Sequence, residues 1–220
     1  MQARTIETTT HGRYLIRVPS MPGPWPVLVG FHGYAETAET QLERLAAVPG
    51  TDAWTLVAAQ GLNRFYRGRT QDVVAGWMTR QDRDDAIRDN VAYVDNVIEA
   101  TRTGSEPIVV AGFSQGVAMA FRAAVLGRAG VNGVISVGGD IPPELLAGSA
   151  SASPFPRVLL IRGATDDWYT AKKLHADMSA LRARGDEPEA FTHDGGHEWT
   201  ADVAMAAGDF LAHWNGPRTR

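Results

Sequence analysis

The segment Gly112-Phe113-Ser114-Gln115-Gly116 decides the fold that this sequence predicts. An apolar run at residues 107–111 precedes it and an Ala-rich stretch at residues 117–126 follows it, so a buried strand leads through the pentapeptide into a helix. A serine at such a turn has strained backbone angles, and glycine on both sides lets the strand and the helix approach closely. The segment therefore predicts a nucleophile elbow, with Ser114 as the candidate nucleophile.

The composition predicts one globular domain over residues 1–220. With 44% hydrophobic and 21% charged residues, the 220-residue chain is long enough to bury one sizeable core. Its 21 basic and 25 acidic residues give a net charge of −4, which argues against nucleic acid as a partner. Because the chain has no cysteine, disulfides, thiolate metal sites and a cysteine nucleophile are excluded.

The sequence predicts neither a targeting segment nor a membrane span. Residues 1–10 contain no apolar signal core. No later run approaches the roughly 18 apolar residues that a membrane-spanning helix needs. A cytoplasmic location is therefore the default expectation, and the oligomeric state stays open, with a homodimer as one option.

Alternating strand and helix patterns predict an α/β fold. Apolar runs at residues 26–31, 55–59, 107–111 and 133–137 predict strands, and residues 157–162 and 188–193 supply two more. Continuous Val, Ile and Leu runs without alternation suggest strands covered on both faces. Residues 5–10 and 13–18 are expected to form an antiparallel pair joined at His11-Gly12. Helical patterns lie between the runs, at residues 37–47, 83–102, 116–128, 170–184 and 199–214. We expect a mostly parallel, doubly wound sheet with helices on both faces, and residues 140–156 are too few for a cap domain.

A serine nucleophile needs a base and an acid that orients the base, and both occur downstream in the expected order. Asp166 follows the apolar run at residues 157–162, and His197 follows Gly195-Gly196 in a loop before the last helix. For the acid, Asp167 is the second choice and Asp140 the third. The other histidines precede the serine or are expected within a strand or helix.

Backbone amides and loop aromatics complete the predicted site. The developing oxyanion needs two amide donors, and the amides of Gln115 and Tyr34 are the best placed in the sequence. His32 is interpreted as a structural brace of the loop that carries Tyr34. His193 and His197 are four residues apart, but the glycine pair between them argues against a metal site.

With these residues in place, the chain resembles the α/β-hydrolase superfamily, and within it the phospholipase/carboxylesterase family that includes acyl-protein thioesterases. The similarity extends from about residue 26 to the C-terminal helix. It rests on four segments: His32-Gly33-Tyr34, the pentapeptide at residues 112–116, Gly163-Ala164-Thr165-Asp166 and Gly196-His197-Glu198. The resemblance implies Ser114 as nucleophile, Asp166 as orienting acid, His197 as base, and the amides of Tyr34 and Gln115 as the oxyanion hole.

Two departures from the family pattern concern the substrate pocket. Trp77 is followed by Met78 and Thr79 where family members often have Trp-Phe-Asp, and an aromatic pair, Trp168-Tyr169, follows Asp167 in place of an apolar Pro-Val pair. Trp77, Trp168 and Tyr169 are therefore candidates for lining the pocket, with packing beneath loops as the alternative. Residues 63–69, which carry three arginines around Phe65 and Tyr66, are interpreted as a solvated loop rather than a grip for an acidic substrate.

The predicted reaction is hydrolysis of a small-molecule carboxylic ester or thioester through an acyl-enzyme, without a metal or an organic cofactor. The same three side chains also serve peptide or carbon–carbon bond cleavage, and the fold does not separate these reactions. A hydrolase relative that binds a ligand without catalysis is the hypothesis from a different class.

Overall fold

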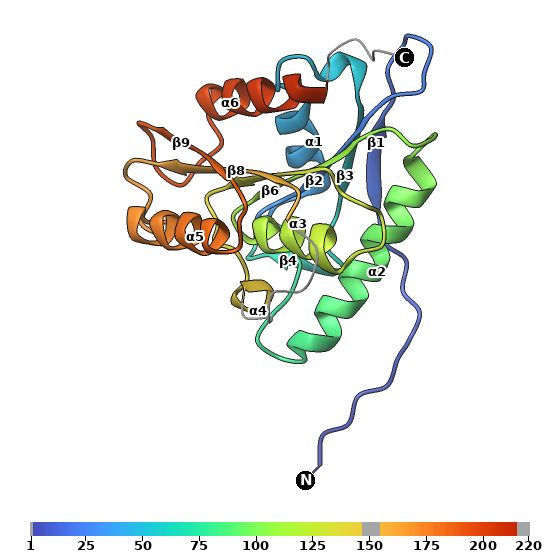
Figure 1. Cartoon of the computed structure of the whole chain (residues 1–220). Helices are drawn as coiled ribbons and strands as arrows, with labels where there is room; N and C mark the ends of the chain where they lie inside the picture. The colour runs from blue at the N-terminus through green and yellow to red at the C-terminus, as the bar shows by residue number, and fades with distance from the viewer. Residues whose placement is uncertain (1, 147–154, 215–220) are drawn as a thin grey trace.

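The computed structural model describes residues 2–146 and 155–214. Within these residues a seven-stranded sheet forms the centre of the molecule (Figure 1). Its strands lie in the order β1 (Tyr14–Arg17), β3 (Thr55–Ala59), β2 (Val27–Phe31), β6 (Ile108–Phe113), β7 (Gly133–Val137), β8 (Arg157–Gly163) and β9 (Glu189–His193). β1 is antiparallel to β3, and the other neighbouring pairs are parallel.

Helices cover both faces of the sheet. Successive strand residues point to opposite sides, so the apolar strands present side chains on both faces that must be buried. α1 (Ala38–Ala46) and α6 (Ala201–Leu211) cover one face, where they pack on strand residues such as Leu28 and Val109. α2 (Arg83–Thr101), α3 (Gln115–Leu126) and α5 (Ala171–Ala183) cover the other, on residues such as Val29 and Val110 (Figure 1). The four named strand side chains are fully buried, as expected for strands covered on both faces.

The parallel strands bring three predicted site loops to one edge. Parallel strands connected by helical crossovers all end at the same edge of a sheet. Ser114 follows β6, Asp166 lies three residues beyond β8, and His197 lies four residues beyond β9. The topology therefore gathers residues that are far apart in the sequence.

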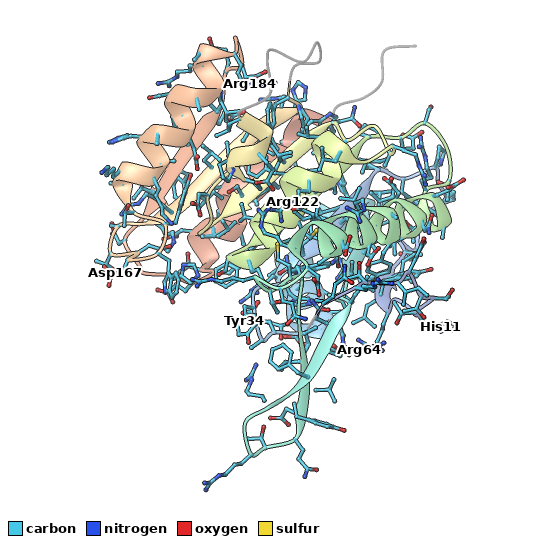
Figure 2. The ribbon with its side chains drawn as sticks, turned by 90° about the horizontal axis from the view of Figure 1, so that it is seen from below. His11, Tyr34, Arg64, Arg122, Asp167 and Arg184 are labelled. Carbon is cyan, nitrogen blue, oxygen red and sulfur yellow. The ribbon has the colours of Figure 1, made fainter. Side chains whose placement is uncertain are left out.

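Residues 63–76 form a two-stranded arm in place of the predicted solvated loop. β4 (Asn63–Arg67) pairs antiparallel with β5 (Asp72–Gly76), and the hairpin projects from the body of the molecule (Figure 2). Its base is anchored because the Phe65 ring stacks on Tyr34 at 5.4 Å and Ala75 exchanges backbone hydrogen bonds with Ala35 and Glu36. The loop conformation was wrongly predicted because these contacts are long-range and leave no local pattern, whereas the predicted exposure of residues 63–69 is confirmed except at the half-buried Phe65.

The predicted strand at residues 5–10 is also absent from the structure. Those residues are exposed, and β1 begins only at Tyr14. β1 pairs with β3, and Tyr14 lies opposite Ala59. The edge of the large sheet thus gives β1 its partner, and the polar residues 5–10 have no apolar face to bury.

Short elements adjust the predicted boundaries. Threonine side chains cap three helices, since Thr37, Thr170 and Thr200 accept hydrogen bonds from amides in the first turns of α1, α5 and α6. The last predicted helix, residues 199–214, begins after its Thr200 cap as α6 and is followed by a 3₁₀ turn, η2 (Ala212–Trp214). Two further short elements, η1 (Thr51–Ala53) and α4 (Pro143–Leu146), were not predicted. Part of the expected loop at residues 140–156 lies outside the described residues.

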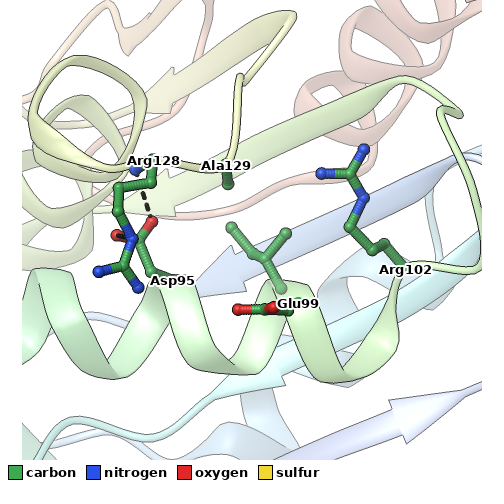
Figure 3. A pocket seen from close by; sticks show the side chains of 6 residues that line it. Asp95, Glu99, Arg102, Arg128 and Ala129 are labelled. Atoms are coloured by element: carbon green, nitrogen blue, oxygen red, sulfur yellow. Dashed lines mark hydrogen bonds and ion pairs between the residues drawn. The ribbon is translucent and has the colours of Figure 1, made fainter.

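A pocket of about 280 Å³ lies where α2 meets the residues that follow α3 (Figure 3). Asp95 accepts a hydrogen bond from the Arg128 amide at 2.9 Å and pairs with the Arg128 guanidinium at 3.5 Å. Glu99 and Arg102 also line it, so its four charged side chains balance. The pocket is at the opposite end of α3 from Ser114, and the Asp95–Arg128 contacts beside it connect α2 to the segment that follows α3.

The contact between α3 and β2 predicts a stability effect at Gly116. A Cβ there would lie 2.1 Å from the Phe31 carbonyl oxygen, so Gly116→Ala should lower the unfolding free energy by about 1–3 kcal/mol, which is several degrees in Tm. Gly104→Ala is the matched control because nothing lies within 4 Å of its Cβ. Thermal unfolding followed by circular dichroism measures both, and equal Tm values for the two variants would contradict this packing.

Candidate active site

Ser114 stands at a strained turn between β6 and α3. Its φ of 52° and ψ of −118° lie in a region that side-chain-bearing residues rarely adopt. The turn is held because the Ser114 amide donates to the Val137 carbonyl at 2.9 Å, and a Cβ on Gly112 would lie 2.4 Å from the Gly116 oxygen. The surrounding structure must maintain such a strained conformation. At this turn the strained conformation presents the serine hydroxyl to the pocket.

Two hydrogen bonds connect the three candidate catalytic side chains. The Nε2 atom of His197 is 2.9 Å from the Ser114 Oγ, and its Nδ1 atom is 2.9 Å from Asp166 Oδ2. The structure thus brings together the three residues that the sequence proposed for nucleophile, base and acid. Their order along the hydrogen-bonded chain is the one that proton transfer from a serine requires.

Asp166 is held as a carboxylate by donors on both oxygens. Its Oδ1 atom accepts the amides of Trp168 at 2.8 Å and Tyr169 at 2.9 Å, while Oδ2 faces His197. Burial raises the pKa of Asp166, but the hydrogen bonds from Tyr169, His197 and Trp168 together lower it below its ordinary value. The charged carboxylate therefore favours the His197 tautomer with a proton on Nδ1, which leaves Nε2 free to accept the serine proton.

Backbone hydrogen bonds connect the loop that carries Asp166 to the loop that carries His197. Ala164 donates its amide to the His193 carbonyl at 2.7 Å, and Thr165 donates its amide to the Gly195 carbonyl at 3.1 Å. A Cβ on Gly163 would lie 2.1 Å from the Gly196 oxygen, so only glycine fits at this approach. This contact fixes the separation of Asp166 and His197.

The competing acids and histidines occupy other positions. The Asp167 side chain is exposed, and Asp140 lies at the pocket rim, 3.4 Å from the Lys173 ammonium. His193 ends β9 and accepts the Gly195 amide at 3.1 Å. Asp166 is therefore the carboxylate that reaches His197.

His32 is a brace within the loop that carries Tyr34. Its Nε2 accepts the Gly61 amide at 3.0 Å, so its Nδ1, 2.7 Å from the Gly33 carbonyl oxygen, carries the proton and donates. Burial lowers the pKa of His32, which keeps the ring neutral. The geometry agrees with the structural interpretation of this histidine.

A pocket of about 540 Å³ opens beside Ser114 and His197. The sequence analysis did not indicate four of its ten lining residues. Gly138 and Gly139 follow β7 at the same sheet edge, and their place after a strand was the available signal, whereas Ala118 and Lys173 lie on helices and carried none. The lining residues are Tyr34, Ser114, Gln115, Ala118, Gly138, Gly139, Asp140, Trp168, Lys173 and His197.

Of the three predicted aromatic lining residues, only Trp168 lies in this wall, with 74% of its surface exposed. Trp77 is fully buried against Phe31, and its indole N–H donates to the His32 carbonyl at 2.9 Å. Tyr169 is also fully buried. The prediction is corrected for Trp77 and Tyr169, because both belong to the hydrophobic core beneath the loops.

The two residues predicted to donate to the oxyanion both line the pocket beside Ser114. Gln115 is the first residue of α3, so its amide has no acceptor within the helix. Its side chain accepts the Trp77 amide at 2.8 Å and donates to the Met78 carbonyl at 3.1 Å. Tyr34 borders the same pocket, at the base of the hairpin arm.

A buried pair lies behind the acid loop. The Tyr169 hydroxyl donates to Asp177 Oδ2 at 2.9 Å, and the Ile141 amide donates to the same oxygen at 3.3 Å. Burial raises the pKa of Asp177 to about 6, aided by the negative charge of Asp140 and opposed by these two hydrogen bonds and by Lys173. The pair ties α5 to the loop whose amides hold Asp166.

Two features are absent from the described residues. Over residues 2–146 and 155–214, no group of three or more His, Asp or Glu side chains is arranged to hold a metal ion. In the same residues, no helix is both long and apolar enough to cross a membrane.

The fold is shared with solved hydrolase structures. Acyl-protein thioesterase 2 of Zea mays is similar with a TM-score of 0.71 at 18% identity, covering 94% of this chain and 100% of that one. Esterase PE8 has a TM-score of 0.72 at 22% identity over 92% and 98%. A Bacillus cereus carboxylesterase has 0.67 at 13% identity over 92% and 94%. These likenesses, with the sheet order described above, define the α/β-hydrolase fold.

Sequence comparison gives the family. The model of the phospholipase/carboxylesterase family matches residues 26–215. The chain therefore belongs to this family and is a hydrolase, which confirms the resemblance seen in the sequence. No curated protein matches the sequence.

The buried Asp177 predicts a pH-dependent stability difference. Its pKa in the folded protein, about 6, lies above the ordinary 3.8, so the folded state binds the proton more tightly and stability is lost as the pH rises between these values. Asp177→Asn keeps an acceptor oxygen but cannot ionise. Urea unfolding from about pH 4 to pH 7 should show the variant gaining on the wild type by on the order of 2 kcal/mol. A difference that is constant across this range would refute the prediction.

Proposed function

We propose that the protein hydrolyses carboxylic esters or thioesters, with Ser114 as nucleophile, His197 as general base and acid, and Asp166 as the orienting carboxylate. The observation that carries this proposal is the continuous hydrogen-bonded chain from Ser114 Oγ through the His197 ring to Asp166. A serine hydroxyl is a weak nucleophile at neutral pH, and this chain supplies the proton acceptor that it needs.

The first half of the reaction forms an acyl-enzyme. Ser114 Oγ attacks the substrate carbonyl carbon while His197 Nε2 takes the hydroxyl proton. The carbonyl oxygen becomes an oxyanion, and the amides of Tyr34 and Gln115 stabilise it. When the intermediate collapses, the bond to the alcohol or thiol breaks, and the leaving group takes the proton from His197. The acyl group remains on Ser114.

The second half releases the acid. A water molecule gives a proton to His197 Nε2 and attacks the acyl carbon, and the oxyanion forms again at the same two amides. Collapse breaks the bond to Ser114 Oγ, which recovers its proton from His197. Water is the sole co-reactant, so the cycle needs no redox partner.

The pocket supports a soluble ester of modest size as the substrate. Gly138, Gly139 and Ala118 are small and leave space beside the nucleophile, while Trp168 forms an apolar wall. The ion pair of Lys173 and Asp140 makes part of the wall polar. In the described part of the chain, no segment covers this opening as a cap domain, which favours free entry of small molecules over interfacial lipid hydrolysis.

The test is hydrolysis of p-nitrophenyl esters of increasing chain length, with an acyl-thioester and a peptide amide alongside. We expect the wild type to hydrolyse the esters or the thioester and to react with a fluorophosphonate probe at one serine. Ser114→Ala should lose labelling and at least about 10³-fold in kcat. Ser179→Ala, at an exposed serine of α5, is the control and should match the wild type.

Three results would count against the proposal. Ester hydrolysis by Ser114→Ala at the wild-type rate would remove Ser114 from the reaction. Absence of probe labelling in an otherwise folded wild type would favour a ligand-binding relative without catalysis. Turnover confined to the amide would move the substrate class to peptides.

A further inference from the structure

Arg44, on α1, contacts three segments that meet at the active site. Its guanidinium makes two hydrogen bonds to the Glu36 carboxylate, at 2.6 and 2.8 Å. It also lies over the Phe113 ring, 4.3 Å from its centroid, and 6.0 Å from the Trp199 ring. Glu36 follows the oxyanion donor Tyr34 by two residues, Phe113 precedes Ser114, and Trp199 follows His197 by two. One side chain thus contacts the oxyanion, nucleophile and histidine segments.

The Glu36 carboxylate transmits this contact to the backbone beside Tyr34. Its Oε2 atom accepts the Gly33 amide at 2.7 Å as well as the Arg44 guanidinium. On the other side of Tyr34, the Ala35 amide donates to the Ala75 carbonyl at 2.9 Å. The peptide that presents the Tyr34 amide is therefore held at both neighbours, by Glu36 and Arg44 on one side and by β5 on the other.

The Phe113 contact extends toward the base. The Phe113 ring lies 5.1 Å from the His197 ring, at an interplanar angle of 35°, and the Arg44 guanidinium lies over the same Phe113 ring. Arginine has the planar group that suits both a two-bond pair with a carboxylate and a contact with an aromatic face. The same guanidinium therefore supports the imidazole through one intervening ring.

The pair is partly buried and charged. The side chains of Arg44 and Glu36 are 17% and 22% exposed. Burial raises the pKa of Glu36, but the hydrogen bonds and charge of Arg44 and the Gly33 amide lower it below its ordinary value. Arg44 does not line the substrate pocket, so any effect on the reaction acts through these neighbours.

We propose that Arg44 is a positioning residue. Through Glu36 and Phe113 it holds the Tyr34 amide and the His197 ring in place relative to Ser114. This inference rests on the hydrolase function proposed above. Arg44 limits movement of the Tyr34 amide, because hydrogen-bond donors stabilise the transition state only when they are already placed where the charge develops.

The experiment compares Arg44→Met, Arg44→Lys and Glu36→Gln with the wild type on a p-nitrophenyl ester. The maximal velocity is divided by the concentration of reactive sites, counted by exhaustive fluorophosphonate titration, so that the resulting kcat excludes unfolded protein. We expect Arg44→Met to lose about 10- to 100-fold in kcat with KM within about twofold. Arg44→Lys should recover part of the loss, since an ammonium can pair with Glu36 but lacks the planar fork.

The matched control breaks another ion pair of α1. Glu39 pairs with Arg13 at 2.5 Å on the exposed side of the helix, so Glu39→Gln should keep kcat and KM near the wild-type values. A folded Arg44→Met variant with wild-type kcat per reactive site would overturn the positioning role, even if its Tm falls. A loss that appears in KM alone would overturn it as well.

Two comparisons separate this inference from the proposed function. If the wild type neither hydrolyses esters nor reacts with the probe, the hydrolase function fails. If the wild type is active and the Arg44 variants match it per site, only the positioning role fails. Should Arg44→Met not fold, Glu36→Gln and Arg44→Lys test the positioning role by the same measurement of kcat per reactive site.

Discussion

Two hydrogen bonds of 2.9 Å, from Ser114 to His197 and from His197 to Asp166, are the constraint on which the proposed chemistry depends. They can form only if the ends of β6, β8 and β9 are correctly spaced, because each residue lies on a loop that follows one of these strands. The parallel ladder supplies this spacing, and the crossovers through α3 and α5 return the chain to the same edge.

Close backbone contacts turn this spacing into a defined geometry. Glycine at 112, 116 and 163 lets segments approach to distances that a Cβ would prevent. The contacts at 112 and 116 hold Ser114 at its positive φ, and the contact at 163 fixes the separation of the acid and base loops. Polar pairs then support the loops from behind. Asp177 and Tyr169 hold the loop that carries Asp166, and Glu36 holds the peptide beside Tyr34. The site is thus supported by the layer beneath it as well as by its own hydrogen bonds.

The sequence predicted the parts of the molecule whose signal is local. Apolar runs predicted the strands of the parallel sheet, although β9, expected to be covered on both faces, is an edge strand whose residues are mostly exposed. Glycine around Ser114 and before His197 marked the turns that carry the site. Long-range partners left no such signal. The hairpin at residues 63–76 depends on the Tyr34 ring and on backbone hydrogen bonds with Ala35 and Glu36. Trp77 is buried because Phe31 and His32 pack against it. Arg44 gave no hint of its contacts, since its partners lie on three separate segments.

The proposed chemistry requires Asp166 to orient His197, and the neighbouring Asp167 provides the control for this role. The two carboxyls are adjacent in sequence, yet one accepts from His197 and the other is exposed. The decisive measurement is kcat for ester hydrolysis by Asp166→Asn and Asp167→Asn, each checked for folding by its Tm. We expect a loss of about 10³- to 10⁴-fold for Asp166→Asn, because an amide no longer favours the required histidine tautomer, and a loss of less than about twofold for Asp167→Asn. Full activity in Asp166→Asn, or an equal loss in both variants, would contradict the orienting role of Asp166.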